Sequence, residues 1–243
     1  MLDSVPESGH LHLDPDTVLS PGSGAAALRA AGALTAAVDA VYAGEGDNAF
    51  CAVRPPGHHA ERERAMGFCL FNNVAVGAHQ ALAEHGAEKV AVVDFDVHHG
   101  NGSQDAAAHE ARLFYASSHQ SPAYPGTGAE SDHGYNDNVL NVELSPGSGS
   151  IPFRDGYERK ILPALSDFAP DLLMISAGFD AHARDPLCQL EVATDDFAWV
   201  TRQLMAVAAE HCQGRVVSVL EGGYDLEALA DSVAAHVREL MRS

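Results

Sequence analysis

The stretch that decides the fold runs Val90-Ala91-Val92-Val93-Asp94-Phe95-Asp96-Val97-His98-His99-Gly100-Asn101-Gly102. It begins as a short run rich in β-branched residues, which is typical of a strand buried on both faces. It then becomes acidic and histidine-rich and ends at Gly-Asn-Gly. Because residues two apart in an extended segment point to the same side, Asp96 and His98 could together bind one metal ion. An isolated Asp-X-His is more often a strand cap before a solvated turn, but four other stretches of this chain direct polar groups to the same place.

Apolar strands alternate with helical segments on both sides of this stretch. We expect strands at 50–53, 89–96, 113–117, 139–142, 171–176 and 215–220, and helices at 24–43, 71–85, 103–110, 152–168, 194–211 and 225–241. Strands that are almost wholly apolar are typical of a parallel sheet with helices on both faces. No repeat, linker or low-complexity tract divides the chain, so we expect one α/β domain over residues 1–243.

The composition excludes several classes of protein. The formal net charge is −20, from 34 acidic and 14 basic residues, which argues against nucleic acid or an anionic membrane as the main partner. No apolar run reaches the ~18 residues of a membrane span, and the N-terminus has no pattern of a secretory signal. Four widely spaced cysteines without a Cys-X-X-Cys motif indicate a reducing compartment, so we expect a cytoplasmic protein.

Polar side chains follow five of the expected strands at the point where each strand ends. They are His58 and His59, then Asp94, Asp96, His98, His99 and Asn101, then Ser117 and His119, then Asp180, and finally Glu221 and Tyr224. In parallel α/β folds, ligands bind at the C-terminal ends of the strands. We therefore expect these side chains to form one site.

The residue types in this set limit the chemistry. Asp96, His98 and Asp180 offer three nitrogen and oxygen ligands with an open position, which fits a catalytic Zn²⁺, with Fe²⁺ or Co²⁺ as alternatives. The pair His58-His59 can supply a general base and acid. Asp94 and Asn101 could orient these imidazoles, and Tyr224 could donate a hydrogen bond to a developing oxyanion. Together these groups predict metal-assisted hydrolysis of an amide or related acyl bond.

Six blocks of this sequence resemble the zinc-dependent histone deacetylase family, in its class II branch, and the related acetylpolyamine and deacetylase-like amidohydrolases. The blocks are Arg54-Pro-Pro-Gly-His-His-Ala60, Gly67-Phe-Cys-Leu-Phe-Asn-Asn73, Val93-Asp-Phe-Asp-Val-His-His-Gly-Asn-Gly102, Tyr124-Pro-Gly-Thr-Gly128, Ser176-Ala-Gly-Phe-Asp-Ala-His182 and Leu220-Glu-Gly-Gly-Tyr224. The resemblance implies a three-layer αβα open sandwich of the arginase/deacetylase type, with a mostly parallel sheet of about eight strands.

The resemblance also implies a role for each site residue. Asp96, His98 and Asp180 would be the zinc ligands, with His59 as general base and then acid, His58 as its electrostatic partner and Tyr224 polarising the scissile carbonyl. Asp94 would pair with His58, and Asn101 would lie near His59 and mark the class II branch. Phe68 beside Gly67 would line one wall of a narrow acyl-lysine tunnel, Tyr124 the other, and Asp16 would bind substrate backbone at the rim. A structural K⁺ or Na⁺ is implied near Asp94, Asp96, His98 and Ser117.

Two positions bear on activity and substrate. Weakly active class IIa relatives have histidine where this chain has Tyr224, so we expect real deacetylase activity. Leu187 falls where a polyamine-selective relative carries an acidic gatekeeper, which favours an acyl-lysine peptide or a small neutral N-acyl amine as substrate. The alternatives are an amidohydrolase of acetylpolyamines or of another small metabolite, and a catalytically silent acyl-lysine-binding module.

Two further expectations concern the surface. The His-His motif comes earlier here than is usual in the family, so the N-terminal part of the family fold would be missing. A sheet edge exposed by a missing strand is commonly covered, and a homo-oligomer could supply the cover. We expect His99 to be a structural partner in its turn, and eight histidines to lie on the surface: His10, His12, His79, His85, His109, His133, His211 and His236.

Overall fold

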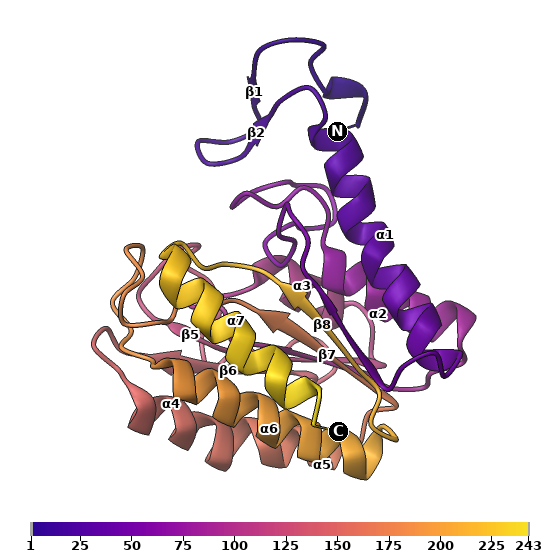
Figure 1. The fold of residues 1–243 in the computed structure, drawn as a ribbon, viewed down its shortest axis with the longest axis vertical. Coiled ribbons are helices and arrows are strands. Elements are labelled where there is room, and N and C mark those ends of the chain that lie inside the picture. Colours follow the sequence, from indigo (N-terminus) through magenta and orange to yellow (C-terminus); the bar gives the residue numbers. More distant parts are fainter. Residues whose placement is uncertain (1, 243) are drawn as a thin grey trace.

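A six-stranded parallel sheet forms the centre of the molecule (Figure 1). The computed structural model describes residues 2–242. In spatial order, the strands are β3 (Asn48–Cys51), β8 (Val216–Leu220), β7 (Leu172–Ala177), β4 (Val90–Asp94), β5 (Leu113–Gln120) and β6 (Val139–Leu144). Every neighbouring pair is parallel. The organising strand β4 therefore lies inside the sheet, with β7 on one side and β5 on the other.

The strand count corrects the expectation of about eight strands in one sheet. In the part of the chain that the structure describes, the remaining two strands are β1 (Leu11–His12) and β2 (Val18–Leu19), which pair antiparallel in a separate small sheet. Each has two residues, and the segment around them is rich in proline, glycine and serine, which favour turns. In Figure 1 this hairpin projects from the body near the N-terminus.

Helices cover both faces of the sheet, so the predicted three-layer α/β sandwich is confirmed. One layer contains α1 (Ser23–Tyr42), α2 (Asn73–Glu84) and α3 (Asn101–Ala108). The other contains α4 (Ser150–Gly156), a π-turn at Tyr157–Ile161, α5 (Leu162–Phe168), α6 (Thr194–His211) and α7 (Leu226–Leu240). In Figure 1, α4, α5 and α6 run along the bottom of the view and α7 crosses in front. A single 3₁₀ turn, η1, spans Leu2–Ser4.

The apolar pattern of β4 explains why it lies between two layers. Ala91 and Val93 belong to the core cluster beneath α6, whereas Val90 and Val92 belong to the cluster beneath α1 and α2. Successive side chains of a strand point to opposite faces, so a continuous apolar run is buried on both. All five residues of β4 are buried.

Helix α1 is long and apolar enough to cross a membrane by length and composition alone, which the lack of an unbroken apolar run did not indicate. The core helix of a globular protein passes the same test. Here its buried residues Leu34, Val38 and Val41 belong to the same core cluster as residues of α2 and the sheet. We therefore describe α1 as a core helix.

The strand order reverses beside β4, and this reversal places the site. From β4 the chain goes to β5 and β6 on one side, and then returns to β7 and β8 on the other. Ligands in open α/β sheets bind at such a point, outside the C-terminal ends of the strands. The loops after β4 and β7 therefore meet there.

One of the eight histidines expected at the surface is buried, and that expectation is wrong for His236. Its side chain has no exposed area. Nδ1 lies 2.6 Å from Thr201 Oγ1, and Nε2 lies 2.8 Å from Ser218 Oγ. Because the Thr201 hydroxyl donates to the Phe197 carbonyl, Nδ1 donates to Thr201 and Nε2 accepts from Ser218. The apolar pattern of α7 does not indicate that the hydroxyls of Thr201 and Ser218 lie beside this ring.

Burial lowers the pKa of His236 from its ordinary value of 6.5 to about 3, which predicts a pH-dependent stability. The unfolded chain takes up a proton here below pH 6.5 and the folded chain does not, so the free energy of unfolding falls as the pH falls from about 6.5 to 3. In chemical denaturation, His236→Gln should lose about 2 kcal/mol less than the wild type between pH 7 and 5. The exposed-site control His133→Gln should follow the wild type. An unchanged pH dependence in His236→Gln would refute this origin.

Candidate metal centre and active site

Three ligand-type side chains converge where β4 and β7 end. Asp96 and His98 follow β4, and Asp180 follows β7. One ligand atom from each lies within 4.8 Å of the others, and this is a group of metal-binding type among residues 2–242. His98 Nδ1 lies 3.2 Å from Asp96 Oδ1 and 3.1 Å from Asp180 Oδ2. The sequence prediction that these three residues come together is therefore met by the geometry.

The surroundings of these ligands fit a cation. Two buried carboxylates face one another, and burial, followed by the charge of Asp96, raises the pKa of Asp180 to about 6. A bound cation would relieve that repulsion. Two glycines leave space for these carboxylates. A Cβ at Gly178 would collide with the Asp96 carboxylate, and a Cβ at Gly222 would collide with the Asp180 carboxylate. Two carboxylates and one imidazole with an open side match the ligand set of a catalytic Zn²⁺.

Backbone amides fix the direction of both carboxylates. Gly222 N–H donates to Asp96 Oδ2 at 2.8 Å, and His98 N–H donates to Asp96 Oδ1 at 2.9 Å. Val97 N–H donates to Asp180 Oδ1 at 2.9 Å. Backbone amides thus hold three of the four carboxylate oxygens before a ligand arrives, which is the arrangement of a pre-organised site.

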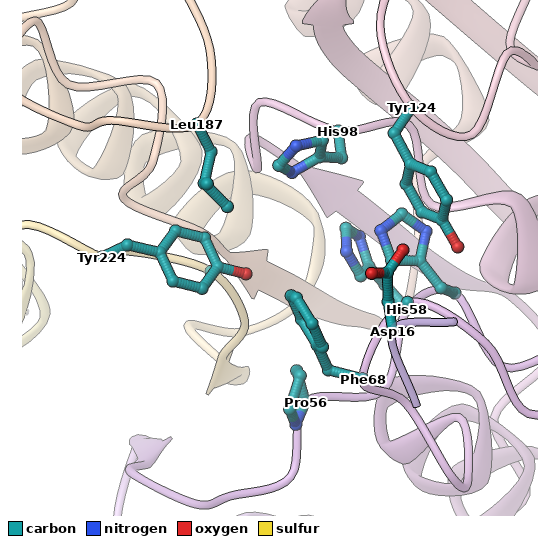
Figure 2. A pocket seen from close by; sticks show the side chains of 11 residues that line it. Asp16, Pro56, His58, Phe68, His98, Tyr124, Leu187 and Tyr224 are labelled. Carbon is teal, nitrogen blue, oxygen red and sulfur yellow. The ribbon is translucent and has the colours of Figure 1, made fainter. Parts of the chain in front are cut away.

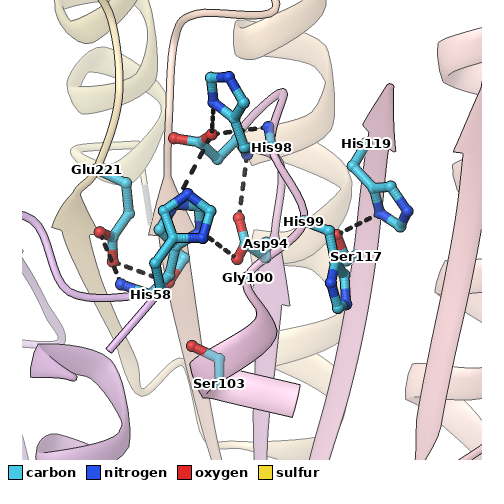
Figure 3. A network of polar contacts seen from close by, with 12 residues as sticks. His58, Asp94, His98, His99, Gly100, Ser103, Ser117, His119 and Glu221 are labelled. Atoms are coloured by element: carbon cyan, nitrogen blue, oxygen red, sulfur yellow. Dashed lines mark hydrogen bonds and ion pairs between the residues drawn. The ribbon is translucent and has the colours of Figure 1, made fainter. Parts of the chain in front are cut away.

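Asp94 lies next to this cluster and forms a hydrogen bond with His58 (Figure 3). Its Oδ2 accepts from His58 Nδ1 at 3.0 Å and from the Tyr115 hydroxyl at 3.1 Å, and its Oδ1 accepts from Asp96 N–H. Burial alone would lower the pKa of His58, but the carboxylates of Asp94 and Asp96 outweigh it and raise that pKa to about 10. His58 is therefore held as a cation beside the ligands. Tyr115 lies in the strand expected at 113–117, and the sequence does not indicate this hydrogen bond.

His59 has a different partner and the opposite electrostatics. Its Nδ1 lies 2.9 Å from Asn101 Oδ1, at the start of α3. Burial, and next the positive charge of His58, lower the pKa of His59 to about 2. One imidazole of the pair is thus held neutral and the other charged, which separates an acceptor of protons from a fixed positive charge.

Glu221 braces the loop that carries both histidines, a role that the sequence did not indicate. The loop starts at β3, on the edge of the sheet, and His58 reaches Asp94 at the end of β4, with β8 and β7 lying between these two strands. The Glu221 carboxylate accepts from Gly57 N–H at 2.7 Å, from His58 N–H at 3.2 Å and from the Ser176 hydroxyl at 3.1 Å. Burial raises its pKa to about 7. Its position after an apolar strand was a signal, but the partners are far away in sequence.

A cavity of about 250 Å³ opens onto the metal ligands (Figure 2). Eleven residues line it: Asp16, Pro56, His58, His59, Gly67, Phe68, His98, Tyr124, Leu187, Gly222 and Tyr224. All five residues predicted to contact substrate are among them. Figure 2 shows Phe68, Tyr124 and Leu187 around the opening, with the Tyr224 hydroxyl directed inward. Burial raises the pKa of Tyr224 well above its ordinary value, so the phenol stays a hydrogen-bond donor.

Local backbone geometry explains why Gly67 and Phe68 stand at the wall. Gly67 has a φ of 55°, and a Cβ there would lie 2.5 Å from the His59 ring, so only glycine leaves the ring in place. Phe68 N–H donates to Thr17 Oγ1 at 3.2 Å, which ties this wall to the segment that carries Asp16.

Asp185 connects Leu187, on the cavity wall, to Tyr224. The sequence did not indicate this role of Asp185 either. Its Oδ2 accepts from Tyr224 N–H at 2.7 Å, and its Oδ1 accepts from Leu187 N–H at 3.1 Å. One buried carboxylate therefore fixes the cavity-lining leucine and the tyrosine backbone together.

The other predicted positions lie nearby. Ser117 on β5 is opposite Asp94 in the sheet register, and its hydroxyl contacts His119 Nδ1 at 2.9 Å. His99 points away from the metal ligands and bridges Thr127 Oγ1 and Gln104 Oε1, at 2.8 and 2.9 Å. The turn role expected for His99 agrees with these contacts.

Comparison with known families agrees with this geometry. The model of the histone deacetylase domain matches residues 3–240. The chain belongs to the histone deacetylase family. The crystal structure of the HDA15 HD domain superimposes on all of the chain with a TM-score of 0.94 and 37% sequence identity, and the match covers 68% of that structure. The predicted family and fold class are therefore confirmed.

Several known proteins are similar to this chain over most of its length. An uncharacterised protein of Synechocystis is 45% identical over 240 residues, covering 99% of this chain and 77% of the relative. Histone deacetylase 14 of Arabidopsis, a chloroplastic protein, is 44% identical over 88% of this chain and 52% of its own length. The histone deacetylase-like amidohydrolase of Pseudomonas aeruginosa is 43% identical over 91% and 59%, respectively. The chain thus spans little more than half of these two relatives.

Proposed function

We propose that this protein is a zinc-dependent hydrolase that removes an acyl group from an N-acyl amine, with acetyl-lysine in a peptide as the leading substrate. One observation carries the proposal: Asp96, His98 and Asp180 come together, and His98 lines a cavity that His59 and Tyr224 also line. The named deacetylases and amidohydrolase among the relatives support a hydrolase of this kind.

The residues of the chain divide the chemistry among them. Zn²⁺ bound by the three ligands would polarise the scissile carbonyl and lower the pKa of a water molecule. His59, whose Nδ1 faces Asn101 and whose ring lines the cavity, takes a proton from the attacking water at Nε2 and later delivers it to the leaving amine. Tyr224 donates its hydroxyl to the oxygen that gains negative charge. His58, charged beside Asp94 and Asp96, offsets part of the negative charge of the buried carboxylates.

The cavity favours a linear chain that enters between aromatic walls. Phe68 and Tyr124 flank the opening, and Asp16 lies at its rim (Figure 2), where a carboxylate can accept from a substrate amide. Leu187 is 47% exposed and lines the same opening. An uncharged wall at this place supports acyl-lysine over a cationic acetylpolyamine, as an expected preference within the class II branch.

A monovalent cation forms part of the proposal. Asp94 lies beside Ser117 in the sheet register, two residues before Asp96. Oxygen ligands from this region suit K⁺ or Na⁺, and such an ion would stiffen the segment 94–98. We also propose that the protein acts in a reducing compartment, consistent with four free cysteines.

Leu187→Glu tests the assigned substrate preference. A carboxylate at the opening should attract the cationic tail of acetylputrescine, so kcat/KM for acetylputrescine relative to an acetyl-lysine peptide should rise about tenfold. The control Leu187→Gln introduces a side chain of the same shape as glutamate but without its charge, and it should change this ratio of kcat/KM values little. Both values come from initial rates on the two substrates. A wild type that already prefers acetylputrescine more than about tenfold would overturn the preference for acyl-lysine.

A further inference from the structure

A second and larger cavity, of about 690 Å³, lies on the far side of the loop that carries the two histidines. The turn Glu61–Arg64, helix α2 and helix α3 form its walls. The turn closes by paired backbone hydrogen bonds between Glu61 and Arg64. Glu61 and Glu63 both line this cavity. The site described above makes no use of either acid.

Glu61 differs from Glu63 because it contacts the partner of His59. The Asn101 side-chain Nδ2 donates to Glu61 Oε1 at 2.6 Å. The other atoms near that nitrogen are also acceptors: the His59 carbonyl at 3.3 Å and the Met66 sulfur at 3.4 Å. Among residues 2–242, the His59 ring nitrogen is the polar partner of Asn101 Oδ1, at 2.9 Å. His59, Asn101 and Glu61 thus form a chain from the active site to the second cavity.

This chain has a defined direction. A reversed Asn101 amide would turn its oxygen toward the Glu61 carboxylate, where two acceptors repel, and its NH₂ toward His59 Nδ1. With the observed direction, His59 Nδ1 must carry hydrogen, because Asn101 Oδ1 can only accept. The partner of one ring nitrogen decides which nitrogen of a neutral histidine is protonated. The lone pair of His59 is then on Nε2.

We propose that Glu61 is a positioning residue that holds the Asn101 amide in one orientation and so keeps the Nε2 of His59 free to accept a proton. The inference rests on the proposed function, which makes His59 the general base. His58 meets its carboxylate, Asp94, directly. For His59, the neutral amide of Asn101 lies between the ring and the Glu61 carboxylate. An amide can adopt two orientations related by rotation, and the hydrogen bond to Glu61 selects one of them.

The local structure fixes the position of Asn101 and leaves only the rotation of its side-chain amide open. Helix α3 starts against the backbone of the histidine loop: Gly102 and Ser103 N–H both donate to the His58 carbonyl, at 3.0 and 3.1 Å. A Cβ at Gly102 would collide with the Ala60 carbonyl. Asn101 is therefore pressed against His59, and only the rotation of its amide remains to be fixed.

Glu61→Ala, Glu61→Gln and the matched Glu63→Ala test this assignment in the zinc-loaded full chain. Glu61→Ala should lower kcat for an acetyl-lysine peptide about tenfold with KM changed less than about twofold, since partners of this kind typically contribute 10- to 100-fold. Glu61→Gln keeps an acceptor oxygen and should restore most of the rate. Glu63→Ala should match the wild type. In an Asn101→Ala background, Glu61→Ala should have no further effect.

Nitrogen NMR of the histidine rings gives a second readout, independent of turnover. The wild type should show His59 as the Nδ1–H tautomer, assigned by the signal that His59→Gln removes, and Glu61→Ala should show a mixture. A wild type that cleaves no acyl amine would refute the proposed function, while the tautomer would still test Glu61. An unchanged kcat in Glu61→Ala, a loss of rate with an unchanged tautomer, or an equal loss in Glu63→Ala would overturn the role of Glu61.

Discussion

Replacing His59 by glutamine is expected to lower kcat about a thousandfold, the largest effect of any single change outside the metal ligands. Glutamine keeps a similar length and can still face Asn101, but it cannot take up a proton. The ring of His59 lines the cavity and is held neutral by burial. The substrate should still enter, so KM should change little. Steady-state kinetics on an acetyl-lysine peptide measure both quantities.

Two controls separate chemistry from folding in that experiment. The zinc content and the melting temperature of His59→Gln should equal those of the wild type, because His59 contributes no metal ligand. His133→Gln replaces an exposed histidine and should leave kcat unchanged. If His59→Gln keeps more than about a tenth of the wild-type kcat, another group is the general base.

Tyr224→Phe is expected to lower kcat by about 100- to 1000-fold, the range found when one oxyanion donor is removed. The change deletes only a hydroxyl that points into the cavity (Figure 2). The phenyl ring keeps its edge contact with Phe68, whose ring centre lies 6.1 Å away, so the wall should stay in place. A hydroxamate inhibitor, measured by calorimetry, should still bind.

The matched control for this change is Tyr135→Phe, at a tyrosine that is 82% exposed. That variant should be indistinguishable from the wild type. A loss in Tyr224→Phe that appears wholly in KM would contradict a role in the transition state, because uniform binding affects KM and leaves kcat unchanged.

The sequence predicted much of the site because the ends of buried strands can be located where an apolar run gives way to polar residues. The apolar run before Asp94 identified a buried strand, and parallel strands bring their C-terminal ends to one edge. Alternation along the extended segment put Asp96 and His98 on one side. The resemblance to the deacetylase family then implied the different roles of Asp94 and Asp96, and the hydrogen bond between Asp94 and His58 agrees with that division.

The partners that the sequence missed are distant along the chain. Glu221 lies more than 160 residues from the loop that it braces, and Asp185 lies 39 residues before Tyr224. The helical pattern around His236 predicts a surface residue, but Thr201 of α6 and Ser218 of β8 contact its ring. Such pairings depend on which strand lies next to which, and the order β3-β8-β7-β4-β5-β6 cannot be derived from apolar periodicity.

The most direct test of the central claim is a zinc titration of metal-free protein, followed by elemental analysis and by initial rates on an acetyl-lysine peptide. Asp96, His98 and Asp180 predict one tightly bound Zn²⁺ per chain, with activity rising in proportion until that ratio is reached. Asp180→Asn should bind far less zinc and stay inactive. Zinc-loaded, folded protein that cleaves no acyl-lysine and no acylpolyamine would contradict the proposed function.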